Sequence, residues 1–214
     1  MENVTDRVSN PFGMRPPEEY PPVDDGPDAV YGYGDANADF YVVGANPTVH
    51  GGETTGVPFT ETVGARRLQR VLHDVGFLAE PYSDRPDADN LFVSYLFMPR
   101  LPNGRSPDEG DYETMERFFD AEFRAINPHV VLPVGATAID RVLESYTTLR
   151  RKFTVPIDED DVHATEARGR GFLVVPVKEP ANWTVEDEAA LRDRLTAILN
   201  SDYRQTKGVS TIVG

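Results

Sequence analysis

The stretch FYVVGANP, residues 40–47, decides how this chain folds. Its four consecutive apolar residues, 40–43, are typical of a parallel strand that is buried on both faces. Gly44 ends the strand, and Pro47 stiffens the turn that follows. Residues 46–62 are rich in Gly and Thr, which predicts a loop before the next helix.

The same alternation of apolar strand and amphipathic helix recurs along the chain. The other strands are expected at residues 91–93, 130–134 and 172–177. Helices are expected at residues 68–75, 111–126, 135–143 and 184–199. Strands that alternate with helices favour a parallel sheet covered by helices on both faces. We therefore predict an α/β fold, a three-layer αβα sandwich around a central, mostly parallel sheet of four strands.

The 214 residues suffice for one domain with a full hydrophobic core and are few for two. Residues 1–35 are rich in proline, so we expect an irregular N-terminal segment along the surface. The folded domain is expected to span residues 36–200. Residues 201–214 carry no strong signal and are expected to form a C-terminal tail.

The composition excludes several classes of site. The chain has no cysteine, which rules out disulfides, iron–sulfur clusters and thiolate zinc sites. Its histidines are scattered without a helical i, i+4 pair, so we expect no metal site and no other cofactor. No apolar run reaches the length of a membrane span and the first residues do not resemble a signal peptide, which predicts a cytoplasmic protein with no membrane segment.

The net charge of the chain is −15, from 36 acidic and 21 basic residues. Only three of the basic residues are lysines, so 18 are arginines. We interpret this balance as that of a salt-adapted, halophilic protein, whose carboxylate-rich surface stays hydrated in concentrated KCl. The alternative is an acidic protein that avoids phosphate. Because salt screens charges over a few ångströms, the net charge says little about what the protein binds, and local clusters of arginine say more.

In a sheet of this kind, chemistry is expected in the loops at the carboxyl ends of the strands. The first loop holds Asn46, whose amide could bind a base edge or position a water molecule, and Phe59, whose ring could stack on a flat ligand. The alternative for Asn46 and Pro47 is a plain turn. In the second loop Tyr95 could donate a hydrogen bond into a pocket, with a packing role as the alternative.

The second loop continues to Arg100 and Arg105, which could bind phosphate or be solvated by water. The third loop places Glu179, Asn182 and Trp183 close together at a strand end. For the last two residues the alternatives are a cap of the next helix and a packing anchor.

Together these loops resemble the uracil-DNA glycosylase superfamily over roughly residues 39–199. Residues 44–47 and 56–59 are similar to the superfamily's first motif. The order of elements from residue 92 to residue 143 resembles the iron–sulfur branch of the superfamily. Residues 179–181 fall where these families carry a His-Pro-Ser-type motif.

The resemblance implies base flipping followed by hydrolysis of the N-glycosidic bond of uracil or another deaminated base. It implies a monomer that acts on DNA containing damaged or deaminated bases. The catalytic residues that it suggests are Asn46, for positioning water, and Glu179. The base-binding residues would be Gly44, Ala45, Pro47, Phe59 and Tyr95. The DNA-binding residues would be Arg100, Arg105, Pro180, Asn182 and Trp183.

Three positions depart from the family pattern. Ala45 stands where the iron–sulfur branch has a glutamate, and Tyr95 stands where its uracil-reading members have an asparagine. Glu179 replaces a histidine, and an ionised carboxylate there would oppose an anionic leaving base unless it were protonated or turned away. Glu179 could instead accept a hydrogen bond from a different base. The alternative function is therefore a catalytically inactive member that binds nucleic acid or a nucleobase. An unrelated nucleotide-binding domain is disfavoured because the chain has no G-x-G-x-x-G turn.

Overall fold

The computed structural model describes residues 8–15, 17, 20, 22–169 and 171–204. In this part of the chain seven strands form one sheet in the order β1-β2-β4-β3-β5-β7-β6. The strands are β1 (Val8–Ser9), β2 (Tyr33–Gly34), β3 (Phe40–Gly44), β4 (Leu91–Tyr95), β5 (Val130–Pro133), β6 (Ala167–Arg168) and β7 (Leu173–Val174).

The four central strands β4, β3, β5 and β7 run parallel, as the sequence predicts. The register sets Val42 of β3 beside Val93 of β4 and Leu132 of β5. Strands β1, β2 and β6 are antiparallel additions at the two edges. Their exact positions cannot be located from the sequence, because two residues are too few to show an alternating pattern. Two of them lie within residues 1–35, so the sheet uses part of the segment that we expected to be irregular.

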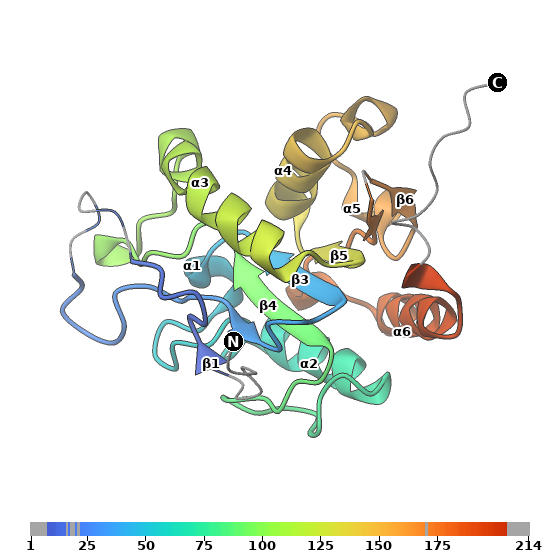
Figure 1. Cartoon of the computed structure of the whole chain (residues 1–214), viewed down its shortest axis with the longest axis horizontal. Coiled ribbons are helices and arrows are strands. Elements are labelled where there is room, and N and C mark those ends of the chain that lie inside the picture. The colour runs from blue at the N-terminus through green and yellow to red at the C-terminus, as the bar shows by residue number, and fades with distance from the viewer. Residues whose placement is uncertain (1–7, 16, 18–19, 21, 170, 205–214) are drawn as a thin grey trace.

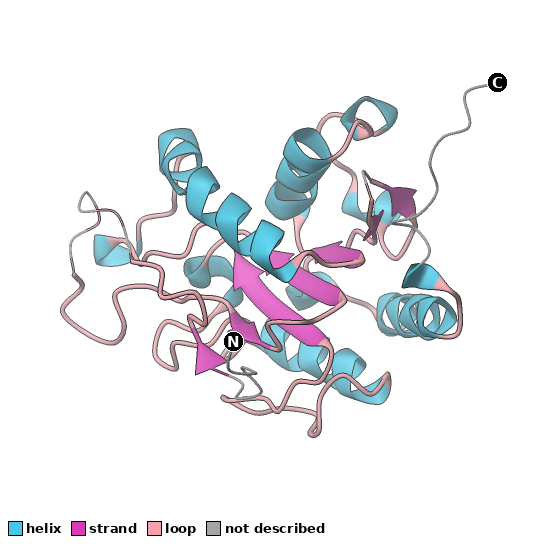
Figure 2. Ribbon diagram, in the orientation of Figure 1, coloured by secondary structure: helices cyan, strands magenta, loops and turns pink. Residues whose placement is uncertain are grey.

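Helices cover both faces of the sheet, which confirms the predicted three-layer αβα sandwich (Figures 1 and 2). One face carries α3 (Glu109–Ile126) and α4 (Ala136–Tyr146), and the other carries α2 (Val63–Asp74) and α6 (Val185–Leu199). The shorter helices are α1 (Pro47–His50), α5 (Glu159–Val162) and the 3-10 turns η1 (Pro102–Gly104), η2 (Arg150–Lys152) and η3 (Pro180–Asn182).

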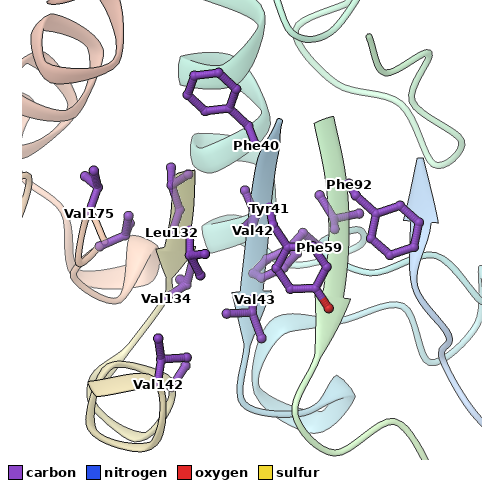
Figure 3. Close-up of a cluster of buried hydrophobic side chains, with 14 of the residues drawn as sticks. Phe40, Tyr41, Val42, Val43, Phe59, Phe92, Leu132, Val134, Val142 and Val175 are labelled. Carbon is purple, nitrogen blue, oxygen red and sulfur yellow. The ribbon is translucent and has the colours of Figure 1, made fainter. Parts of the chain in front are cut away.

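The core lies around β3, whose five residues are all buried. Its apolar side chains lie between those of β4 and β5 (Figure 3). Tyr41 of β3 stacks on Phe92 of β4, with ring centroids 5.7 Å apart. Each large apolar side chain buried in this way stabilises the fold by about 1.5–3 kcal/mol. The unbroken apolar run of the sequence is therefore explained by a strand that has packed layers on both sides.

The described residues stop short of both ends of the chain. The last ten residues of the predicted tail, 205–214, lie outside the described residues, as do residues 1–7 of the N-terminal segment. Among the helices that the structure describes, none combines the length and the apolar character that crossing a membrane requires.

Candidate active site

A pocket of about 450 Å³ opens at the carboxyl end of the parallel sheet. Its walls come from the loops that follow β3, β5 and β7, together with the start of α3 and the short helix α5. The side chains with polar atoms in its lining are Asn46, His50, Ser106, Tyr112, Thr137, Glu159, Glu179 and Asn182. Segments far apart in the sequence thus meet in one cavity, as the parallel topology requires.

Asn46 is held in one orientation by bonds at both ends of its amide. Its Oδ1 accepts a hydrogen bond from the backbone N–H of Val49 at 3.2 Å, which caps α1. Its Nδ2 donates to the hydroxyl of Tyr112 at 3.1 Å. Burial raises the pKa of Tyr112, so this hydroxyl stays protonated at neutral pH. Asn46 is therefore a helix cap and a pocket residue at the same time, and the turn-forming Pro47 is the first residue of α1.

His50 pairs with Glu179 across the pocket. Its Nε2 lies 3.0 Å from Oε2 of Glu179. The imidazole is buried, with a 3% exposed side chain, whereas the side chain of Glu179 is 20% exposed. The sequence did not single out His50, because its partner lies 129 residues away. The only available signal was its position in the first loop.

Two glycines leave room for this pair. A Cβ atom on Gly44 would lie 2.7 Å from Nδ1 of His50, and one on Gly135 would lie 3.2 Å from Oε2 of Glu179. Gly135 also has a φ of 80°, in the region that favours glycine. The resemblance places Gly44 among the base-binding residues, but the atoms that approach it here belong to the side chains of His50, Phe59 and Tyr95.

A second carboxylate, that of Glu159, lies in the lining of the pocket. Its Oε1 accepts from the backbone N–H of Ala136 at 2.5 Å, and its Oε2 accepts from the backbone N–H of Glu179 at 2.8 Å. Glu159 therefore accepts a hydrogen bond from an N–H at the start of α4 that has no partner within the helix. Its second oxygen links the start of α4 to the loop that contains Glu179. Sequence reasoning missed this residue because it lies in an acidic segment that reads as a solvated surface.

Phe59 and Tyr95 lie in the core, outside the lining of the pocket. Figure 3 shows the Phe59 ring within the cluster of buried side chains. The Tyr95 hydroxyl accepts from the backbone N–H of Phe59 at 2.7 Å and donates to the carbonyl of Gly51 at 2.9 Å. Burial raises the pKa of Tyr95 well above its usual value. Tyr95 thus holds a loop in which Phe59 adopts an unfavourable positive φ of 56°.

Both arginines that we expected to bind DNA have carboxylate partners. The guanidinium of Arg100 bonds to the backbone carbonyl of Asp25 and lies 3.9 Å from the carboxylate of Glu53. Arg105 lies 2.7 Å from the carboxylate of Asp111. Burial by itself would raise the pKa of Asp111. The hydrogen bond from Arg105 and other contacts outweigh this effect, so the pKa of Asp111 is lowered. These arginines tie loops together in the present structure.

The third loop divides between the pocket and the core. Glu179 and Asn182 line the pocket, and Asn182 is exposed. Pro180 is buried, and Trp183 is only 4% exposed, with its indole N–H donating to the carbonyl of Lys178 at 2.8 Å. Of the other expected base-binding residues, Ala45 lines the pocket as well.

The comparisons with known proteins agree with this architecture. Residues 31–201 match the model of the uracil-DNA glycosylase superfamily. The chain is 30% identical over 116 residues to the type-5 uracil-DNA glycosylase of Pyrobaculum aerophilum, a match covering 52% of this chain and 51% of that protein. It is 28% identical over 120 residues to the type-5 uracil-DNA glycosylase of Mycobacterium leprae, covering 53% and 52%. The chain thus matches these curated relatives over about half of their length. From the extent of the family match, this chain belongs to the uracil-DNA glycosylase superfamily.

Proposed function

We propose that this chain is a DNA glycosylase that hydrolyses the N-glycosidic bond of uracil or another deaminated base. The observation that carries the proposal is that Asn46 and Glu179, both expected to be catalytic, line the same pocket of about 450 Å³. Membership of the superfamily and the names of the two relatives support it. The base would enter the pocket after it flips out of the DNA stack.

In this proposal Asn46 positions the attacking water molecule. Its Oδ1 accepts one hydrogen bond from Val49 and keeps a second lone pair that can accept another from water. The water oxygen attacks C1′ of the sugar while the bond from C1′ to the base nitrogen breaks. The electron pair of that bond leaves with the base, which takes up the proton released by the water. Tyr112 contributes by preventing rotation of the Asn46 amide.

The pairing with His50 answers the electrostatic objection to Glu179. An unpaired carboxylate beside the leaving base would raise the energy of the negative charge that gathers there. Here the Glu179 carboxylate has a partner, because its Oε2 lies 3.0 Å from Nε2 of His50. The leaving base then meets a hydrogen-bonded pair in place of an isolated anion. Because carboxylate oxygens only accept hydrogen bonds, the same pair favours a base that presents an N–H group to Glu179.

The test is base release from oligonucleotides that contain uracil, hypoxanthine or xanthine, measured as abasic sites in molar KCl and in dilute buffer. Asn46→Ala is expected to slow release by about a hundredfold, the usual effect of removing one positioned polar group. Asn37→Ala, which changes an exposed asparagine outside the pocket, is the matched control. Thermal unfolding of both variants separates loss of the α1 cap from loss of catalysis.

The outcomes separate the candidate functions. Release that is equally fast in Asn46→Ala and wild type contradicts the role of Asn46. DNA binding without release of any of the three bases favours the alternative of a non-catalytic member.

A further inference from the structure

Helix α2 differs in charge from the other long helices that the structure describes. Its twelve residues contain three arginines and one carboxylate. Helix α3 contains six carboxylates and two arginines, and α6 contains four carboxylates and two arginines. Helix α4 has two carboxylates and one arginine. In a chain with a net charge of −15, a cationic helix marks a place where an anionic partner could approach.

Two of the three α2 arginines are exposed on the surface. Arg66 and Arg70 are exposed and stand four residues apart, which places them on one face of the helix. Within the described part of the chain, no ion pair is formed by either residue. The third, Arg67, has a structural role, because it donates to the backbone carbonyl of Trp183 at 2.7 Å.

The start of α2 packs against the Glu179–Ala181 segment, of which Glu179 lines the pocket. A Cβ atom on Gly64 would lie 3.1 Å from the backbone N of Ala181 and 3.4 Å from Oε1 of Glu179. Arg66 is two residues further along α2 than this neighbour of the Glu179 carboxylate, and it lies about 200° around the helix from it, on the solvent side. Because each helical residue advances 1.5 Å, Arg70 lies about 9 Å further along the axis than Gly64.

The guanidinium of Arg66 is already oriented. It lies over the ring of Tyr82, 3.9 Å from the ring centroid. Stacking of this kind covers the flat face of a guanidinium and leaves the N–H groups at its edge free to donate. Tyr82 is itself fixed, since its hydroxyl accepts from the backbone N–H of Glu61 at 2.9 Å and donates to Asp84 at 2.5 Å.

We propose that Arg66 and Arg70 form a phosphate-binding face, which holds the backbone of the DNA strand next to the pocket. Side chains one helical turn apart have Cβ atoms about 5–6 Å apart, a spacing at which two guanidiniums can reach successive phosphates. This inference rests on the proposed function, because it takes DNA as the partner. It adds the surface that positions the strand, a role that we had assigned to Arg100 and Arg105.

A second group of basic residues provides the matched control. Arg151 and Lys152 of η2 are also exposed. They follow the C-terminal end of α4, whose first residues line the pocket. No residue of η2 lies in the lining of the pocket. The pairs Arg66→Ala/Arg70→Ala and Arg151→Ala/Lys152→Ala produce the same change in net charge.

The experiment measures binding of a labelled duplex that contains one 2′-fluoro-deoxyuridine, whose glycosidic bond resists hydrolysis. Fluorescence anisotropy titrations at several KCl concentrations give the slope of log K against log[KCl]. Each phosphate contact contributes about 0.9 to that slope, so Arg66→Ala/Arg70→Ala should lower it by about 1.8. The control pair should leave it unchanged, and Arg66→Lys/Arg70→Lys should retain it because lysine keeps the charge. Thermal unfolding checks that every variant is folded.

Two outcomes overturn the inference alone. They are an unchanged slope in Arg66→Ala/Arg70→Ala, and an equal loss of slope in both alanine pairs, which would show a diffuse effect of charge. In both cases wild type still binds DNA and its base release is unaffected. If wild type neither binds the duplex nor releases a base, the proposed function fails and the inference fails with it.

Discussion

Nε2 of His50 lies 3.0 Å from Oε2 of Glu179, although 129 positions separate the two residues in the chain. The contact joins the loop after β3 to the loop after β7, across the end of β5. It places an imidazole beside the carboxylate of Glu179, which if unpaired would oppose the negative charge that gathers on a leaving base. The pair is therefore the best place to test how the pocket works.

Breaking the pair should slow base release. His50→Ala removes the imidazole partner of the Glu179 carboxylate, and we expect release to fall by about a hundredfold in single-turnover assays. The double variant His50→Ala/Glu179→Gln removes the unpaired charge and should regain part of the loss, because coupled residues do not contribute additively. Equal rates in the single and double variants would show that the pair does not act through charge.

Removing the Tyr95 hydroxyl should destabilise the fold. Tyr95→Phe leaves the N–H of Phe59 and the carbonyl of Gly51 without their buried partner, which should cost about 1–3 kcal/mol in the free energy of unfolding. Urea denaturation measures the loss. Tyr146→Phe is the control, because the buried Tyr146 hydroxyl has no hydrogen-bond partner among the described residues, and we expect little change. A Tyr95→Phe protein as stable as wild type contradicts the assigned role.

The buried carboxyl group of Glu122 should make stability depend on pH. It accepts a hydrogen bond from Tyr41 at 2.6 Å, and burial raises the pKa of Glu122 from 4.5 to about 7. Between these two values the folded protein keeps a proton that the unfolded chain releases. The free energy of unfolding should therefore fall as pH rises through this range, by up to about 3 kcal/mol.

Glu122→Gln tests this expectation because its amide has the same shape and does not titrate. The variant should match wild type near about pH 4.5 and be more stable near about pH 8, as measured by urea denaturation. Parallel pH profiles of the two proteins would assign the pH dependence to other groups.

Adding a methyl group at Gly44 should disturb the pocket. The new Cβ would lie 2.7 Å from Nδ1 of His50 and 2.8 Å from the Phe59 ring, so these side chains must move. We expect Gly44→Ala to lose about 1–3 kcal/mol of stability and to release base more slowly. Gly110→Ala is the control, since its nearest neighbour would be 3.5 Å away in the first turn of α3, and it should be neutral or slightly stabilising. Thermal unfolding and base release check both variants.

The loops that form the site were predictable from the sequence, but the roles of their residues were only partly so. Asn46 and Glu179 were recognisable because strand ends can be located by the apolar run before them. Phe59 and Tyr95 follow the same rule, yet both side chains turn into the core. There the Tyr95 hydroxyl accepts a hydrogen bond from the backbone N–H of Phe59, and the two rings lie 5.3 Å apart. Whether a side chain at or after a strand end faces a pocket or the core depends on backbone direction, which a sequence pattern does not specify.

By itself the sequence determined the four central strands, the helices between them and the end of the sheet at which the functional loops gather. These features follow from local periodicity, and each is visible within a window of about a dozen residues. Only the tertiary structure decided that His50 partners Glu179, that Glu159 joins the lining, and that Arg100 and Arg105 are occupied by carboxylates. Such contacts join residues distant in the chain, and they arise from the order of the strands in the sheet and from the packing above it.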